Sequence, residues 1–505
     1  MSGSGPDASG PRQTNRTMVT VVAMMATTVV LTDQTIAAIA LPHMQGGLSA
    51  SQDQISWVMT TYFMAQAVTM AATGWLAGRI GRKQVYIISL SGFAVCAVLS
   101  GNAESLGEIL IYRALQGVFS APVIPISQAL ILDSYPPEQH GWALSMWGVG
   151  VIFAPVISPV IGGWLTEDYG WEWIFYVSVP FAIFSIIAGM SVIRETPLNL
   201  ERRFDWTGFV AIGLALGALQ LMLDRGTTEG WFESTEIVVE ALFVVAGFYF
   251  FIVHSLTTDH PFISPAIFRD RNMVLGLFFM LLLGIFVLSM NVVVPLFLQN
   301  LRGYPVLTAG LIMAPRGVGS MISLVLAGWL MRRFDSRLVI AFGFANVAFS
   351  AYLFSTFTLD VGVWEFVFAI FFNGAGVGLI FVPLTAISFI TLPPHLRTEG
   401  STLTSLFRVY GAGIGISVMV SVLSRTSVIA HAELTEAVNP YNPLMRVPFL
   451  PEYWNLTTET GRLALEHEIM RQASSIGFLN DFNLLLWGAL LSIPLLALLR
   501  SKAPA

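Results

Sequence analysis

Apolar runs of about 20 residues, the length at which a helix crosses a lipid bilayer, recur along almost the whole chain. Hydrophobic residues make up 55% of the 505 positions and charged residues only 11%, whereas soluble domains carry roughly 25% charged residues. The charges fall in short clusters between the apolar runs. The sequence therefore predicts an all-α polytopic membrane protein.

About fourteen segments are apolar enough to span a membrane. They lie at 18–41, 56–77, 84–103, 108–131, 142–165, 172–193, 206–223, 235–256, 273–298, 307–331, 338–357, 363–390, 400–424 and 481–499. Residues 1–17 are rich in Gly, Ser and Pro and are predicted to form a flexible cytoplasmic tail.

Lys and Arg residues are concentrated in alternate loops, which predicts the orientation of the chain. With a cytoplasmic N-terminus, the inner loops hold clusters such as Arg79, Arg82 and Lys83, and the short outer loops hold only Arg225 and Arg302. The long outer segment at 425–479 is discounted because the rule applies to short loops. Both termini are therefore expected in the cytoplasm.

An internal repeat relates the two halves of the chain. GWLAGRIGRKQV at Gly74 recurs as GWLMRRFDSRLV at Gly328, and SYPPEQHG recurs as TLPPHLRTEG. The repeat predicts two six-helix bundles in pseudo-twofold parallel relation, at 18–193 and 273–499, with two inserted helices at 206–256. Parallel repeats place a substrate path between halves that rock between inward and outward states. The repeat therefore favours a transporter.

A carboxylate, Asp33, lies inside the first predicted span, in the stretch LTDQTIAAIALP. A charge at bilayer depth is costly and usually faces a partner or a cavity, and Arg113 in the fourth span lies within a few Å of the same depth. We therefore predict an Asp33–Arg113 pair. Asp33 can release a proton and arginine cannot, so the pair suits proton coupling, although a static ion pair is the alternative. The repeat aligns these positions with Asn291 and Phe371, so the scaffold does not require charges there.

Further polar side chains within the spans are candidates for lining a substrate cavity. Arg316 and Arg408 attract anionic groups of a substrate, stabilise a gate or bond to backbone carbonyls, three alternatives that the sequence leaves open. The candidates are Tyr62, Gln66, Gln116, Gln128, Asn291, Arg316 and Arg408.

Two glycine-containing motifs indicate gating and close helix packing. In GWLAGRIGRKQV, Gly74 and Gly81 permit tight packing and a sharp bend before Arg82, although a basic loop that sets topology would read the same way. In GVGVIFAPVISPVIGG, small residues recur every four positions and form a close-packing face, which ordinary helix packing would also explain. The candidate residues of this second motif are Gly150, Pro155, Pro159, Gly162 and Gly163.

These motifs resemble those of the major facilitator superfamily. The first is similar to the family's loop motif G-x-L-a-D-r-x-G-r-k, but Gly78 stands where most members have Asp, so the acid of the inner gate is missing or supplied elsewhere. The second resembles the antiporter motif g-x-x-x-G-P-x-i-G-G, which marks exporters, with Ala154 in place of Gly.

LTDQTIAAIALP and IYRALQGVFSAPVIPIS resemble segments of the fourteen-span drug:proton antiporters of the Emr type. In that family the arginine of the second segment is implicated in proton transfer. The resemblance covers nearly the whole chain. It implies a proton-driven exporter of hydrophobic or amphiphilic compounds, such as drugs or fatty acids, in a bacterial inner membrane, served by a periplasmic adaptor and an outer-membrane channel.

Two other functions remain as alternatives, namely a non-transporting receptor or scaffold with this fold and a nutrient uptake symporter. The helix expected in the 425–479 loop docks an adaptor, caps the cavity or packs on the protein itself. The sequence contains no ATP-binding loop, hydrolase elbow, zinc-protease motif or Cys/His cluster, each of which has a recognisable spacing. We therefore expect no enzyme activity, no cofactor, no metal and no nucleic-acid partner, with the proton gradient as the energy source.

Overall fold

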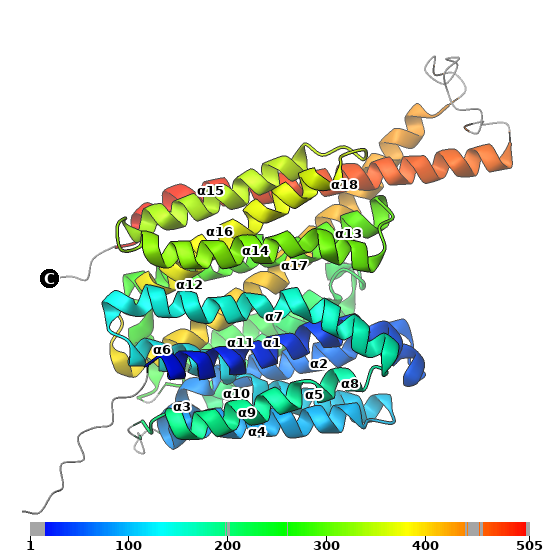
Figure 1. Cartoon of the computed structure of the whole chain (residues 1–505). Helices are drawn as coiled ribbons and strands as arrows, with labels where there is room; N and C mark the ends of the chain where they lie inside the picture. Colours follow the sequence, from blue (N-terminus) through cyan, green and yellow to red (C-terminus); the bar gives the residue numbers. More distant parts are fainter. Residues whose placement is uncertain are drawn as a thin grey trace, which may run out of the picture.

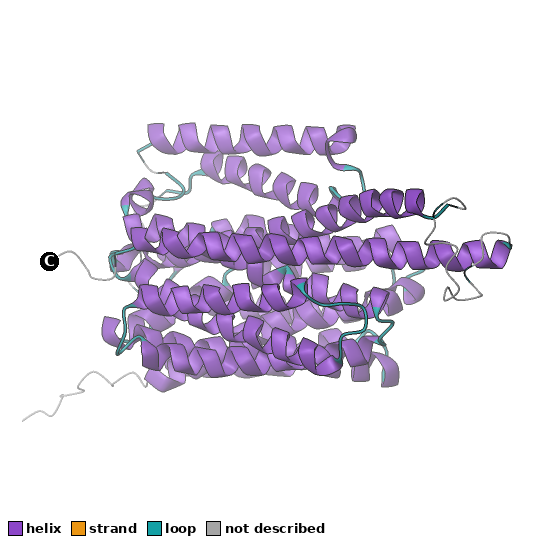
Figure 2. Cartoon of the chain, turned by 90° about the horizontal axis from the view of Figure 1, so that it is seen from above, coloured by secondary structure: helices purple, strands orange, loops and turns teal. Residues whose placement is uncertain are grey.

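The structure, a computed structural model, describes residues 16–196, 198, 203–259, 261–439, 442, 454 and 458–500. Within these ranges the chain forms helices joined by short connections and no strand (Figures 1 and 2). Most of the expected tail at 1–17, and most of the connection between 440 and 457, lie outside the described residues.

The helices that precede residue 193 form what we call the N-terminal group. Within it, α1 packs against α6, α7 and α9, and α5 packs against α2 and α4. Its members are α1 (Arg16–Gly47), α2 (Gln52–Ala71), α3 (Thr73–Ile80), α4 (Arg82–Gly101), α5 (Leu106–Ser120), α6 (Val123–Ser134), α7 (His140–Asp168), α8 (Trp173–Tyr176) and α9 (Ser178–Val192).

The helices that follow residue 270 form the C-terminal group, in which α16 packs against α12, α14 and α15, and α18 packs against α15 and α17. Two π-helical turns, η4 (Gly284–Leu288) and η5 (Phe297–Leu301), flank α13. The members of this group are α12 (Arg271–Leu283), α13 (Met290–Leu296), α14 (Val306–Leu330), α15 (Ser336–Ser355), α16 (Val363–Phe389), α17 (Arg397–Ala437) and α18 (Glu459–Leu495).

The inserted helices α10 (Trp206–Arg225) and α11 (Thr235–Thr257) pack against each other, and α10 also contacts α2 and α17. The two groups meet where α7 lies against α14 and α16, and where α6, α2 and α3 lie against α17. In Figure 1 the N-terminal group lies below and the C-terminal group above this contact. Short 3₁₀ turns occur at Pro137–Gln139, Trp231–Glu233, Pro265–Arg269, Pro394–Leu396 and Leu496–Leu498.

Twelve helical segments of the described chain are long and apolar enough to cross a membrane. The other two expected spans, at 56–77 and 142–165, correspond to α2 with α3 and to α7. α7 runs for 29 residues, from His140 to Asp168, which is long enough to cross a membrane. The all-helical, membrane-spanning fold class expected from the sequence is therefore present.

The start of α1 and the end of α18 lie at the same end of the bundle, which we call the terminal-side end (Figure 1). At the opposite end, the hairpin end, α17 and α18 project well beyond the other helices (Figures 1 and 2). The stretch GRLALEHEIMRQASSIG is helical, as expected, and continues without interruption into the last apolar segment because α18 begins at Glu459.

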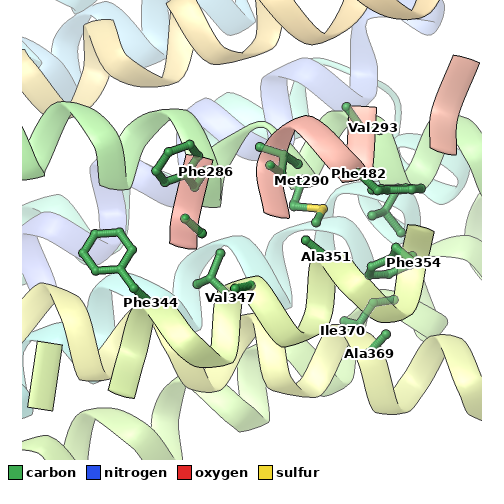
Figure 3. Close-up of a cluster of buried hydrophobic side chains, with 14 of the residues drawn as sticks. Phe286, Met290, Val293, Phe344, Val347, Ala351, Phe354, Ala369, Ile370 and Phe482 are labelled. Carbon is green, nitrogen blue, oxygen red and sulfur yellow. The ribbon is translucent and has the colours of Figure 1, made fainter. Parts of the chain in front are cut away.

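Apolar side chains fill the interior of the C-terminal group (Figure 3). Phe354 of α15 stacks on Phe482 of α18 with ring centroids 4.8 Å apart, and Phe297 of η5 lies edge-on to Phe478 at 5.3 Å. These rings join the connection between α13 and α14 to the projecting helix α18. Such aromatic contacts contribute about 0.5–1.5 kcal/mol each beyond the area they bury.

Candidate functional site

A buried ion pair connects α1 and α5. Arg113 Nη1 lies 2.9 Å from Asp33 Oδ2, and the two side chains are 0% and 1% exposed. Gln116, one turn after Arg113, donates from Nε2 to Asp33 Oδ1 at 3.0 Å and accepts from Arg113 Nη1 at 2.8 Å. The three side chains form a closed hydrogen-bonded triangle. The contact expected between Asp33 and Arg113 is therefore present, and the structure adds Gln116 to it.

Aromatic rings and a thioether enclose the Arg113 guanidinium on its other sides. Its Cζ lies 4.3 Å from the ring centroid of Tyr62 and 5.5 Å from that of Phe175, and Nη2 points at Met59 Sδ at 3.7 Å. Arg113 Nε has no hydrogen-bond partner among the described residues. A desolvated cation–π contact contributes about 2 kcal/mol or more, and part of the burial cost of the cation is offset in this way.

The turn at Ser105 fixes where Arg113 lies along α5. Ser105 Oγ accepts from the backbone N–H of Glu108 at 3.3 Å and so caps the first turn of the helix. A serine cap of this kind stabilises a helix by about 1 kcal/mol. Arg113 is on the same helical face as Gln116 and Gly117, where a Cβ at Gly117 would lie 2.3 Å from the carbonyl oxygen of Tyr62. Glycine at 117 therefore lets α5 approach α2 closely enough for Tyr62 to cover the guanidinium.

A second hydrogen-bonded chain extends from Tyr62. Gln34 Nε2 donates to Tyr62 Oη at 3.2 Å and to Gln66 Oε1 at 3.3 Å, and Gln66 Nε2 donates to Ser120 Oγ at 3.0 Å. Tyr62 and Gln66, both candidates from the sequence, thus belong to one polar network beside the ion pair, with Gln34 and Ser120 as further members. Gln128 of α6 is also buried, but among the described residues it forms no hydrogen bond with the network of Gln34, Tyr62, Gln66 and Ser120.

The corresponding region of the C-terminal group has a different chemistry. Asn291 on α13 is exposed, and Phe371 replaces the arginine. Instead, Arg316 of α14 donates from Nε to Asn373 Oδ1 at 2.9 Å, and Arg408 of α17 has its Cζ 6.0 Å from the ring centroid of Phe381. The ion pair is therefore confined to one half of the repeat.

Phe381 also connects the two groups of helices. Its ring centroid lies 6.1 Å from that of Trp147 on α7, and Trp147 Nε1 donates to Thr27 Oγ1 of α1 at 3.1 Å. Arg408 and Phe381 thus lie beside the contact between the N-terminal and C-terminal groups.

Charged residues close the contact between the two groups at the terminal-side end. Arg82 pairs with Asp133 of α6 and donates from Nε to Thr398 Oγ1 at 2.9 Å. Arg397 Nη1 contacts Asp133 Oδ1 at 3.1 Å and the carbonyl oxygen of Leu132 at 3.2 Å. We call Arg82, Asp133, Arg397 and Thr398 the gate cluster. Asp133 is one acid shared by two arginines from different groups.

The gate cluster contains an acidic partner for Arg82 although position 78 is a glycine. A Cβ at Gly78 would meet nothing within 4 Å, whereas a Cβ at Gly74 would lie 2.6 Å from Cγ of Glu399 on α17. Gly81 has a φ of +87°, the left-handed region that glycine adopts without strain, and it turns the chain from α3 into α4. Gly74 thus allows α3 to lie close to α17, and Asp133 is the acid that contacts Arg82.

Sequence reasoning missed Asp133 and Arg397. Both lie at predicted span ends, where charged residues are ordinary, so only the approach of the two groups reveals that they touch. The sequence contained one clue: Gly78 stands where most family members have an acid, so Arg82 needed an acidic partner from elsewhere in the chain.

The small residues of α7 face α1, as expected of a close-packing face. A Cβ at Gly150 would lie 2.1 Å from Cγ of Met24, and one at Gly162 would lie 3.0 Å from Cγ2 of Ile36. Thr28 Oγ1 donates to the carbonyl oxygen of Gly150 at 3.1 Å. Gly163 has open space around it. The side chains of Pro155 and Pro159 lie outside the described part of the chain.

Comparison with known proteins agrees with this architecture. The sequence profile of the Major Facilitator Superfamily matches residues 23–416. The multidrug export protein EmrB of Escherichia coli (strain K12) is 33% identical over 430 residues, which cover 84% of each chain. The fatty acid resistance protein FarB of Neisseria gonorrhoeae is 33% identical over 416 residues, which cover 81% of each chain.

Solved structures share the fold at low sequence identity. The proton:xylose symporter XylE, bound to 6-bromo-6-deoxy-D-glucose, superposes with a TM-score of 0.58 at 14% identity, covering 92% of this chain and 94% of the symporter. The human organic anion transporter MFSD10 (TETRAN) gives a TM-score of 0.57 at 15% identity, covering 93% and 99%. The chain therefore belongs to the Major Facilitator Superfamily: it is a multi-pass membrane transporter related to Emr-type multidrug exporters, and not an enzyme.

Proposed function

We propose that this chain is a proton-driven antiporter that exports hydrophobic or amphiphilic compounds across a bacterial inner membrane by alternating access. The observation that carries the proposal is the buried triangle of Asp33, Arg113 and Gln116. Asp33 is the member of the triangle that can gain and lose a proton, because arginine stays charged. A functional site is the default hypothesis for an ionisable residue inside a membrane span.

Protonation of Asp33 changes the forces on Arg113. The neutral carboxyl group no longer attracts the guanidinium by its charge, and the guanidinium keeps its contacts with the Gln116 carbonyl, the Met59 sulfur and the surrounding rings. Removing one charge of a buried pair costs about 3–5 kcal/mol in proteins, which approaches the ~5.5 kcal/mol that moves a two-state equilibrium from 1:99 to 99:1. Asp33 takes up a proton from one side of the membrane and releases it to the other side. This exchange couples the proton gradient to the change between inward-open and outward-open states.

The N-terminal and C-terminal groups act as the two rocking units in this proposal, with fourteen spans in all and α10 and α11 as the inserted pair. The terminal-side end faces the cytoplasm, in keeping with the basic residues there. The gate cluster then closes the cytoplasmic side, because it bonds Arg82 and Asp133 of one unit to Arg397 and Thr398 of the other. Opening inward requires these contacts to break.

The cargo site that we propose lies beside Arg408, Phe381 and Trp147. Arg408 forms no ion pair within the described chain, so its charge is available to an anionic group, and the two rings offer apolar surface. An amphiphile with an acidic head, such as a fatty acid, matches this pairing of charge and rings. The relationship to FarB, a fatty acid resistance protein, supports the same class.

Partner proteins are proposed at the hairpin end. The projecting parts of α17 and α18 are positioned to meet a periplasmic adaptor, which in turn would reach an outer-membrane channel. Their projection beyond the other helices supports this placement (Figure 2).

Transport by inverted membrane vesicles tests the function. We expect a medium-chain fatty acid to drive proton movement opposite to its own when the vesicle interior is acidic, and Asp33→Asn to abolish this coupling. Asp360→Asn, which removes an exposed acid near the hairpin end, is the matched control and should behave as the wild type. Movement of cargo and proton in the same direction would indicate a symporter, and movement of neither would indicate a receptor or scaffold.

A further inference from the structure

A second carboxylate, Asp481 of α18, is completely buried within the C-terminal group. Its relative exposure is 0%, and neither Oδ1 nor Oδ2 has a hydrogen-bond partner among the described residues. Asp33 differs in this respect, because each of its oxygens accepts a hydrogen bond. Asp481 is thus an acid that the ion-pair mechanism does not use.

Tightly packed helices surround this acid. On the face of α18 that carries Asp481, a Cβ at Gly477 would lie 2.5 Å from Ser427 Oγ and 3.0 Å from the carbonyl oxygen of Leu423, both on α17, and one at Gly488 would lie 2.6 Å from the ring of Phe286 in η4. The α18 backbone therefore lies directly against its neighbours above and below Asp481.

Aromatic rings flank the same turn. The residue after Asp481 is Phe482, which stacks on Phe354 of α15 (Figure 3), and Phe478 packs on Phe297 of η5. The site of Asp481 therefore offers apolar surface rather than hydrogen-bond donors.

No opposite charge compensates Asp481 from the elements packed against it. η4 and η5 contain no titratable side chain, and α15 contributes only Arg337 at its far end and the exposed Tyr352. The titratable residues of α17 are Arg397, Glu399, Arg408, Tyr410, Arg425, His431, Glu433 and Glu436. None of these forms an ion pair or hydrogen bond with Asp481 in the described chain. Those of α18 itself are all in its first half, Glu459 to Arg471.

An ionised carboxylate in such a place is strongly disfavoured, because it has lost water and gained neither a cation nor a donor. A protonated carboxyl group avoids that cost, since it is neutral. Asp481 also lies near the hairpin end, because Phe482 stacks on Phe354, the penultimate residue of α15. Protons from the aqueous phase at the hairpin end have a short path to Asp481 once the helices separate.

The adjacent helix α12–α13 contains a feature that permits such parting. The π-helical turns η4 and η5 interrupt regular geometry at Phe286 and Phe297, the residues that cover the two ends of this site. π-helical turns inside α-helices occur frequently at functional sites.

We propose that Asp481 is a second proton-binding site, which holds a proton in the conformation seen here and exchanges it with the aqueous phase at the hairpin end when the C-terminal group opens. The step is a simple proton transfer: a water-borne proton adds to the carboxylate to give the neutral acid, and the reverse step returns it to water. The part of the proposal that concerns the transport cycle rests on the proton-driven antiport proposed above, whereas the binding of the proton does not.

Infrared spectroscopy of the full chain in lipid tests proton binding directly. At neutral pH we expect a carbonyl stretch of a protonated carboxylic acid that shifts in D₂O, persists in Asp33→Asn and Asp481→Glu, and disappears in Asp481→Asn. Asp360→Asn, which removes an exposed acid, is the control and should keep the band. If Asp481→Asn leaves every such band unchanged while the protein remains folded, the proposal is overturned.

Proton counting in proteoliposomes tests the exchange. If Asp481 cycles, Asp481→Asn should transport cargo with a proton-to-cargo ratio about half that of the wild type, since one of the two acids proposed to carry protons is gone. An unchanged ratio in a proton-driven wild type would refute the exchange, even if the infrared band is lost. A wild type without proton-driven transport would refute the proposed antiport function instead, and the infrared result would still decide whether Asp481 binds a proton.

Discussion

Asp133 Oδ1 of α6 and Arg397 Nη1 at the start of α17 lie 3.1 Å apart, so a single carboxylate that already pairs with Arg82 also bonds the opposite group of helices. The Asp133 side chain is 33% exposed. An ion pair of this exposure stabilises the contact between the two groups by about 1 kcal/mol or less. The gate cluster can therefore hold the groups together at this end without making the closed state permanent.

Loss of the Asp133 charge should open the terminal-side end more often. A change of about 1 kcal/mol alters a two-state ratio about fivefold. We expect Asp133→Asn to raise the labelling rate of a cysteine placed at Ser401, which is buried and donates to the carbonyl oxygen of Pro125 at 3.0 Å. The measurement uses a maleimide on the Cys96→Ala background, because Cys96 is the only cysteine of the sequence.

Asp335→Asn is the matched control for this prediction. Asp335 caps α15 and forms an ion pair 3.9 Å long with Arg337 of the same group, and asparagine caps a helix as well as aspartate does. Equal labelling rates in Asp133→Asn and Asp335→Asn would show that Asp133 does not hold the two groups together.

Two glycines of α3 should differ sharply in their tolerance of a methyl group. At Gly74 the added Cβ would lie 2.6 Å from Glu399 Cγ and 3.4 Å from its Cα, whereas at Gly78 it meets nothing within 4 Å. Overpacking of this kind costs about 1–3 kcal/mol. We expect Gly74→Ala to slow transport by pushing α17 away from α3.

Gly78→Ala is the companion variant and should transport at least as well as the wild type, because alanine favours helix by up to about 1 kcal/mol over glycine. Both are measured as initial rates of cargo uptake into inverted vesicles at equal protein content. Similar rates for the two variants would argue against a tight contact between α3 and α17.

The sequence predicts the Asp33–Arg113 contact because two charges inside apolar spans have few partners at the same depth. Helical spacing likewise places Gln116 on the face of Arg113. The sequence does not predict the burial of Asp481, since this acid stands at the border of the expected last span, where a carboxylate normally reaches water. Its burial becomes visible only when α18 is seen to begin at Glu459 and to pack against α17 and α15.

Gln116 should stabilise the folded protein through its two bonds to charged partners. Gln116→Leu leaves Asp33 Oδ1 without its donor and removes an acceptor from Arg113. Hydrogen bonds to charged groups contribute about 1.5–3 kcal/mol, so we expect a clear fall in the thermal unfolding midpoint in detergent. Gln84→Leu, which removes an exposed glutamine with one contact of 3.4 Å to Glu195, is the control. Equal midpoints for both variants would contradict a stabilising role for Gln116.

Tyr62 allows the ring and the hydroxyl contributions around Arg113 to be separated. Tyr62→Phe keeps the ring 4.3 Å from Arg113 Cζ and loses the hydroxyl that accepts from Gln34 at 3.2 Å, a neutral bond that contributes about 1 kcal/mol. Tyr62→Leu also loses the cation–π contact, which contributes about 2 kcal/mol or more when desolvated. We therefore expect the unfolding midpoint and the rate of proton-coupled transport to fall in the order wild type, Tyr62→Phe, Tyr62→Leu.

Phe63→Leu, on the neighbouring and less buried ring, controls for the general loss of an aromatic side chain. If Tyr62→Phe is as impaired as Tyr62→Leu, the hydroxyl network through Gln34, rather than the ring, holds the guanidinium in place.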